Sequence, residues 1–174
     1  MDIDEIGAAE IAQRYFVTTE PLVRLGWGIS GYVYLSPDLR TAVKVHRREE
    51  SFVQELAVYR RLRRLRITRL HGLTIPKLRS FRSDVNLIQM DFVRAPYLVD
   101  FAGVTFDPPD FSEDTMEQWH ASIREFFGPN AWVAYAVYHS LAQHGMYYMD
   151  FRPSNLKVEG LPGVQPYAPD SGDL

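Results

Sequence analysis

The stretch GWGISGYV, residues 26–33, decides between two folds for this chain. Glycines in this pattern either join a strand to a helix or form the tip of a β-hairpin. No helix is expected to follow, because residues 32–35 (YVYL) are bulky and β-prone, and a Ser-Pro-Asp turn at 36–38 leads into another apolar run, TAVKV (41–45). The glycines therefore mark a hairpin tip, where the missing side chain lets backbone N–H groups approach phosphates.

The residues around this hairpin predict an α+β protein in which strands lead and helices follow. Apolar residues at helical or alternating spacing define its elements. The predicted elements are helices at 4–16, 49–65 and 132–145, three antiparallel strands within 22–45, and strand pairs formed by 77–81 with 86–93 and by 156–158 with 164–167. Residues 95–118, which are rich in proline and acidic residues, are expected to be irregular and to contain a flexible joint.

Composition excludes several classes of protein. The chain has 174 residues, of which 46% are hydrophobic, and this content suits one globular domain. It has no cysteine, which excludes disulfides and thiolate metal sites. No apolar run approaches the roughly 20 residues of a membrane span, and the N-terminus is acidic, so a cytoplasmic protein without membrane contact is expected. The net charge of −3 does not favour nucleic-acid binding.

Lys44 is one of only three lysines in an arginine-rich chain, and it lies within an apolar strand. An ammonium group that faces a core needs a partner, because burying it alone is costly. Glu55 meets that need, since the pattern FVQEL (52–56) turns its carboxylate towards the apolar side of the predicted helix. The alternative is a lysine at the edge of the strand, exposed to solvent.

Two later motifs carry acidic and amide side chains. Asp150 and Asn155 flank a proline in DFRPSN, a spacing that suits a loop directing both side chains to one place. Asp150 could accept a hydroxyl proton and Asn155 could bind magnesium, although an ordinary Asp/Asn-rich turn fits the same residues. Asp170, in PDSGDL, could be a second metal ligand or part of a solvated tail.

Together, these motifs resemble the protein kinase-like fold. The resemblance covers roughly residues 20 to 172, with six elements in the family's order. It implies ATP and magnesium as cofactors and a two-lobed α+β fold, with an antiparallel sheet in the N-lobe (1–93) and a mainly helical C-lobe (94–174). The implied nucleotide-binding residues are Gly26, Gly28, Gly31, Val33, Ala42, Lys44, Glu55, Met90, Asp91 and Val93; the catalytic residues are Asp150, Lys44 and Arg152; the metal ligands are Asn155 and Asp170.

The sequence departs from the family at several points. Tyr148-Met149 replace the usual His-Arg before the catalytic aspartate, and Ser171 replaces the usual phenylalanine after Asp170. The spacing from Lys44 to Glu55 is shorter than usual, which implies a short loop between the strand that contains Lys44 and the helix that contains Glu55. The sequence ends soon after Asp170, so the C-lobe is expected to be truncated, and an oligomer or a partner chain could complete it.

Three functions fit these residues. The first is an ATP- and magnesium-dependent phosphotransferase that acts on an unidentified hydroxyl acceptor, either a small molecule or a protein. The second is a weakly active or inactive nucleotide-binding pseudokinase or scaffold, and the third is transfer of a nucleotidyl group. The basic run YRRLRRLRITRL (59–70) suits a solvated helix face and, alternatively, an anion-binding or nucleic-acid-binding patch.

Overall fold

The computed structural model describes residues 3–168, which form two compact units. Of the described residues, 3–66 and 76–93 belong to the first unit, and 67–75 and 94–168 belong to the second. Asp170, Ser171 and Gly172 lie outside the described residues. The elements of the first unit are α1 (Glu5–Phe16), β1 (Arg24–Trp27), β2 (Gly31–Leu35), β3 (Thr41–His46), α2 (Glu49–Leu65), β6 (Leu78–Arg82), η1 (Ser83–Val85) and β7 (Leu87–Asp91).

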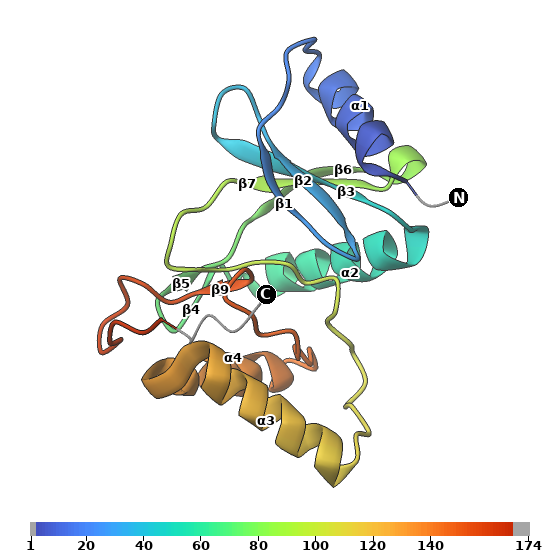
Figure 1. The fold of residues 1–174 in the computed structure, drawn as a ribbon. Helices are drawn as coiled ribbons and strands as arrows, with labels where there is room; N and C mark the ends of the chain where they lie inside the picture. The colour runs from blue at the N-terminus through green and yellow to red at the C-terminus, as the bar shows by residue number, and fades with distance from the viewer. Residues whose placement is uncertain (1–2, 169–174) are drawn as a thin grey trace. The chain divides into compact units, whose positions relative to one another are not determined.

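The first unit is built on a five-stranded antiparallel sheet with the strand order β1-β2-β3-β7-β6 (Figure 1). The glycine pattern lies at the β1–β2 turn, so the hairpin interpretation is confirmed. The helices predicted at 4–16 and 49–65 and the strand pair near 77–93 are present as α1, α2, β6 and β7. The predicted α+β class is therefore confirmed as well.

Strand alternation assigns the two faces of this sheet to different helices. Val43 and Val45 of β3 pack in one cluster with Ala8 and Ala12 of α1. Lys44, between these two valines, points to the opposite face and reaches α2. In α2 the buried positions recur at helical spacing, and they are Phe52, Glu55, Leu56, Val58, Tyr59 and Leu62. Of the arginines of α2, Arg60, Arg63 and Arg64 are exposed and Arg61 is partly buried. The Arg60 guanidinium lies 4.8 Å from the centre of the Phe81 ring.

The turn between β2 and β3 is held by short polar contacts. The Ser36 hydroxyl donates to Asp38 Oδ1 at 2.5 Å and accepts a hydrogen bond from the Thr41 N–H at 3.0 Å. The hydrogen bond from Ser36, followed by that from the Arg40 N–H, lowers the pKa of the Asp38 carboxyl. The Ser-Pro-Asp signal thus forms the tight turn that brings β3 back beside β2.

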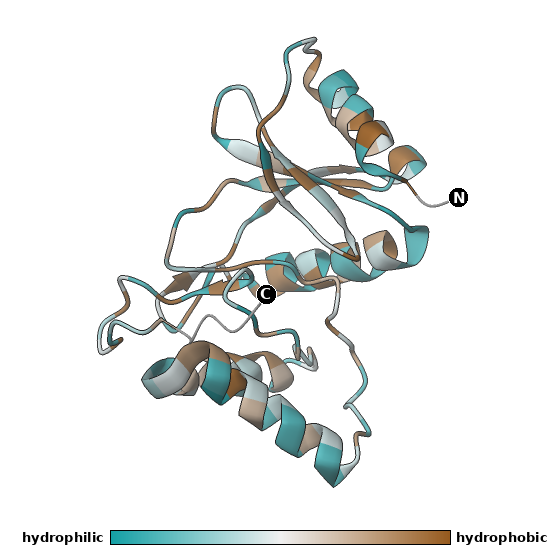
Figure 2. Cartoon of the chain, in the orientation of Figure 1, coloured by the Kyte–Doolittle hydropathy of each residue, from teal (hydrophilic) through white to brown (hydrophobic). Residues whose placement is uncertain are grey.

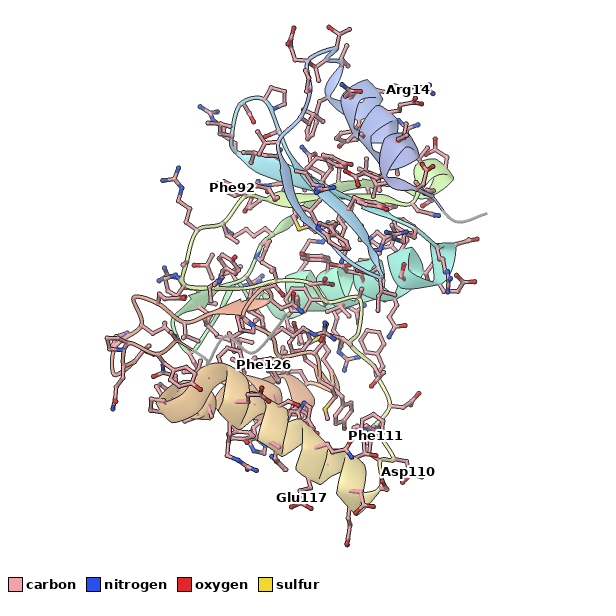
Figure 3. All side chains as sticks on the ribbon, in the orientation of Figure 1. Arg14, Phe92, Asp110, Phe111, Glu117 and Phe126 are labelled. Atoms are coloured by element: carbon pink, nitrogen blue, oxygen red, sulfur yellow. The ribbon has the colours of Figure 1, made fainter. Side chains whose placement is uncertain are left out.

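The second unit combines a small sheet with two helices and short irregular segments. Its elements are β4 (Arg69–Leu70), β5 (Leu73–Thr74), β8 (Tyr97–Leu98), α3 (Glu113–Phe127), η2 (Gly128–Asn130), α4 (Ala131–Ala142) and β9 (Leu156–Lys157). The strand order of its sheet is β4-β5-β8-β9. Helix α4 is apolar on most sides and α3 has a polar outer side (Figure 2). Glu117 lies on that exposed side (Figure 3).

Two predictions for this unit were wrong. Residues 95–118 are not irregular throughout, because α3 begins at Glu113, and the Ser112 hydroxyl caps it by accepting from the Thr115 N–H at 3.3 Å. Residues 156–158 and 164–167 do not pair. Instead, β9 pairs with β8, and Gln165 exchanges two hydrogen bonds with the side chain of Asn130, at 2.8 and 2.9 Å. The predicted helix at 132–145 is present as α4, which ends at Ala142, before the turn that contains Gly145.

The helices of this structure are too short or too polar to span a membrane. This holds for every helix within residues 3–168.

Candidate functional site

The three glycines of the β1–β2 tip have different surroundings. The N–H of Gly28 donates to the Gly31 carbonyl at 3.0 Å and closes the hairpin. A Cβ atom built on Gly26 or Gly28 would meet no heavy atom within 4 Å. At Gly31, a Cβ would lie 2.2 Å from the carbonyl oxygen of Val45. Gly26 and Gly28 therefore leave space beside the tip, whereas Gly31 lets β2 lie close to β3.

This difference gives a stability prediction for the tip. Gly31→Ala should lower the free energy of unfolding by about 1–3 kcal/mol, because the added methyl group would overlap backbone atoms that no rotamer change can move. Gly28→Ala is the matched control and should change it by less than about 1 kcal/mol, since its Cβ would lie in open space. Urea denaturation of both variants measures the effect. Equal losses in the two variants would contradict this division of roles.

Arg47 fastens the tip to the end of β3. Its backbone N–H donates to the Ser30 carbonyl at 3.1 Å, and its side-chain Nε donates to the Gly28 carbonyl at 3.2 Å. Its Nη2 donates to the Tyr32 hydroxyl at 2.5 Å, and the guanidinium lies 4.5 Å from the centre of the Tyr32 ring. The sequence analysis did not single out Arg47, because no local pattern shows that its side chain reaches the Gly28 carbonyl.

Lys44 and Glu55 form a buried ion pair beneath this sheet. Lys44 Nζ lies 2.8 Å from Glu55 Oε2, and the two side chains are 3% and 1% exposed. The predicted pairing is therefore confirmed. Only Arg47 and Arg48 separate β3 from α2, so the short connection still allows the contact. Because burial of either charge alone would be costly, the Glu55 carboxylate holds the Lys44 ammonium group in place.

His46 adds a third polar side chain to this pair, and the sequence analysis did not single it out. It follows Lys44 by two positions, so strand alternation brings both side chains to the face that α2 covers. His46 Nε2 lies 3.4 Å from Glu55 Oε2, and its ring meets Phe52 edge-on at 5.8 Å. Glu55 thus contacts both polar side chains of β3 on this face.

Val33 and Ala42 lie next to Lys44 in the sheet. Val33 is directly opposite Lys44 in the β2–β3 register, and Ala42 precedes Lys44 by two positions on the same face. Ala42 is in turn opposite Met90 of β7. The sheet therefore brings these four predicted nucleotide-binding residues together on adjacent strands.

The predicted hinge residues end β7 and lead out of the first unit. Met90 is buried, and its sulfur accepts a hydrogen bond from the Tyr59 hydroxyl at 3.1 Å. The Asp91 N–H donates to the Lys77 carbonyl at 3.0 Å, and the Asp91 carboxylate binds the Arg79 guanidinium. Val93 is the last residue of the first unit. Contact between this segment and adenine remains a prediction.

In the second unit, one loop brings Asp150, Arg152 and Asn155 together. Arg152 Nε lies 2.7 Å from Asp150 Oδ1, while Asn155 Nδ2 donates to both the carbonyl and Oδ2 of Asp150 at 3.1 Å. The N–H groups of Asn155 and Leu156 both donate to the Arg152 carbonyl at 2.9 Å. The Asp150 side chain is 41% exposed and the Asn155 residue is 7% exposed. A buried amide thus orients an accessible carboxylate.

The oxygen atoms of this loop suit magnesium. Mg²⁺ takes oxygen ligands, and one or two protein groups suffice when phosphates and water supply the rest. Asn155 Oδ1 accepts from the Ser154 hydroxyl at 3.2 Å and, as an amide oxygen, has a second lone pair. Asp170, the other predicted ligand, lies outside the described residues. Within residues 3–168, His, Asp and Glu side chains form no group of three or more that could hold a metal.

Trp119 is a further residue at this loop that sequence reasoning missed. Its indole N–H donates to the carbonyl of Met149, the residue before Asp150, at 2.8 Å. The acidic residues around 113–118 suggested irregular structure and concealed α3, which carries Trp119. The available signal was Ser112 before two acidic residues, followed by Trp119, Ile123 and Phe127 at helical spacing.

Comparisons with known proteins found distant structural similarity. No family model and no curated protein matches the chain. Two solved structures are similar to it: the streptomycin–ATP–APH(2")-IIa ternary complex, with a TM-score of 0.37, and the gentamicin–APH(2")-IIa complex, with a TM-score of 0.38. Each is 18% identical to this chain, and the matches cover 68% of this chain and 35% of the solved chains. APH(2")-IIa is an aminoglycoside phosphotransferase with a protein kinase-like fold.

Proposed function

We propose that this protein is a magnesium-dependent phosphotransferase that moves the γ-phosphoryl group of ATP to a hydroxyl acceptor. The observation that supports this function best is the buried pair of Lys44, on β3, and Glu55, on α2, because β3 pairs with the strand that forms one side of the glycine-rich hairpin. A lysine held by a carboxylate presents its charge in a fixed place, which suits a phosphate ligand. A lysine needed only for solubility would be exposed, not buried with a carboxylate.

The nucleotide is assigned to the first unit. Backbone N–H groups of the tip are proposed to approach the phosphates, and the absence of side chains at Gly26 and Gly28 leaves room for them. Lys44 is proposed to bind the phosphates through its ammonium group. The backbone of the segment from Met90 to Val93 is assigned to adenine.

The acceptor is assigned to Asp150 of the second unit. As the acceptor oxygen bonds to the γ-phosphorus, the bond from that phosphorus to the bridging oxygen breaks and ADP leaves. The hydroxyl proton passes to the Asp150 carboxylate, which Asn155 orients through its amide. Arg152 is proposed to stabilise charge near this carboxylate. Asn155 and Asp170 would hold magnesium, which when bound offsets the charge of the triphosphate.

Nucleotide binding should require the metal. ATP with magnesium should raise the melting temperature, because a ligand at 100 times its Kd adds about 2.7 kcal/mol to the folded state. ATP with EDTA should give a smaller shift in melting temperature. Without magnesium, the negative charge of the triphosphate would not be neutralised and would be repelled by the carboxylate of the proposed metal ligand Asp170. Differential scanning fluorimetry at millimolar nucleotide measures both conditions. Absence of a shift with magnesium and ATP in folded protein would contradict the assigned nucleotide site.

The reaction itself is tested by incubation with γ-labelled ATP, magnesium and a panel of acceptors that contains peptides and polyhydroxylated small molecules. Mass analysis of the protein and of the small molecules then follows the label. A gain of one phosphoryl group on an acceptor supports the proposal. A gain of a nucleotidyl group indicates the alternative transfer chemistry, and binding without product indicates a pseudokinase.

A further inference from the structure

The loop around Asp150 is held on both sides of that residue. Tyr148, two positions before it, is fully buried and donates its hydroxyl to the Val99 carbonyl at 3.2 Å. Phe151, directly after it, is 3% exposed and meets the Tyr148 ring edge-on at 4.8 Å. The residues that flank Asp150 are thus packed, while its carboxylate remains accessible.

Trp119 contacts this loop before and after Asp150. Its indole N–H donates to the Met149 carbonyl at 2.8 Å, and its ring centre lies 6.2 Å from that of Phe151. The same indole packs against two rings of α4, with centres 5.9 Å away at Tyr135 and 5.3 Å away at Tyr138. Aromatic rings of α4 and of the loop therefore hold the indole that donates to the loop.

The accepting carbonyl belongs to the peptide unit that joins Met149 to Asp150. Because a peptide unit is planar, a hydrogen bond to its oxygen also fixes the orientation of the Asp150 N–Cα bond. From the other side, the Asn155 amide binds the Asp150 carbonyl and carboxylate. The direction in which the Asp150 side chain leaves the backbone is consequently set from both ends.

We propose that Trp119 is a positioning residue that orients the Asp150 carboxylate for phosphoryl transfer. This inference rests on the function proposed above for Asp150. Tyr148 and Met149 stand where the resembled family has His-Arg, and each of them ties this loop to another part of the same unit. The side chain of Tyr148 binds one backbone carbonyl, and the carbonyl of Met149 receives the indole N–H of Trp119.

Trp119→Phe tests the hydrogen bond while keeping an aromatic ring in the cluster. Loss of one neutral hydrogen bond should lower kcat by roughly two- to tenfold and leave the KM for magnesium–ATP unchanged, because Trp119 is assigned to the acceptor loop and not to the nucleotide. The matched control is Trp132→Phe, in the same unit, whose tryptophan lies on α4 and is 46% exposed. It should leave both constants unchanged.

Hydrogen exchange provides a second measurement that does not depend on turnover. In Trp119→Phe, the N–H groups of Asn155 and Leu156, which close the loop on the Arg152 carbonyl, should exchange faster by a similar factor than in Trp132→Phe. Should Trp119→Phe fold poorly, 3-benzothienylalanine at position 119 keeps the shape of tryptophan without its N–H group, and the same result is expected.

The outcomes separate this inference from the proposed function. Lower kcat with unchanged KM and faster loop exchange supports the positioning role. If Trp119→Phe matches Trp132→Phe in kcat and loop exchange, the positioning role is overturned and the proposed function stands. If the wild-type protein transfers no phosphoryl group, the proposed function is overturned, and with it the role of Trp119 in catalysis. Hydrogen exchange in the loop then shows whether Trp119 still holds the loop in place.

Discussion

Asp150→Asn is expected to reduce phosphoryl transfer by about 10²–10⁴-fold and to leave the affinity for magnesium–ATP nearly unchanged. The amide can still accept a hydrogen bond from Asn155 Nδ2, but it cannot take the proton of an acceptor hydroxyl. The lost ion pair with Arg152 is well exposed, so stability should fall by less than about 1 kcal/mol. Steady-state kinetics with nucleotide titrations separate the two effects.

Asp110→Asn is the matched control for this variant. Asp110 belongs to the same unit, precedes α3 and is exposed (Figure 3). Removal of its charge should change neither turnover nor nucleotide affinity. Equal turnover in Asp150→Asn and wild-type protein would show that Asp150 is an ordinary turn residue, even if the hairpin still binds nucleotide.

Lys44→Met is expected to lower the free energy of unfolding by about 3–5 kcal/mol, because it leaves the Glu55 carboxylate buried without the ammonium group. In a protein of this length, such a loss lowers Tm by roughly 6–20 °C. Lys77→Met is the control, since Lys77 is exposed and its replacement should have little effect. Chemical denaturation of both variants measures the difference. Similar midpoints would contradict a buried ion pair at Lys44.

The effect of Lys44 on nucleotide binding needs a variant that removes the buried charge as well. Lys44→Met combined with Glu55→Gln takes away both charges, and the amide can still contact His46. This double variant should recover much of the lost stability, because no charge remains buried alone. Its nucleotide affinity should still be at least about tenfold weaker, since a charged contact in such a site contributes about 2–5 kcal/mol. Wild-type affinity in the folded double variant would exclude Lys44 as a phosphate ligand.

Local sequence patterns were sufficient for much of the first unit. The alternation in YVYL and TAVKV and the turn at 36–38 predicted β2 and β3, and the helical spacing in residues 49–65 predicted α2 with its observed limits. The same spacing turned Glu55 towards the sheet, which made its pairing with Lys44 predictable. In the second unit, the acidic residues at the start of α3 outweighed its helical spacing and led to a wrong prediction.

In the first unit the sequence by itself determined which segments become strands and long helices, because those choices depend on periodicity and turn residues within a short stretch of chain. Tertiary structure alone decided that Gly31 lies against the Val45 carbonyl while Gly28 faces open space. It also decided that Arg47 holds the hairpin tip and that Trp119 of α3 binds the carbonyl of Met149. These contacts join residues far apart in the chain, so they exist only once packing has brought the backbones together, and no local pattern encodes them.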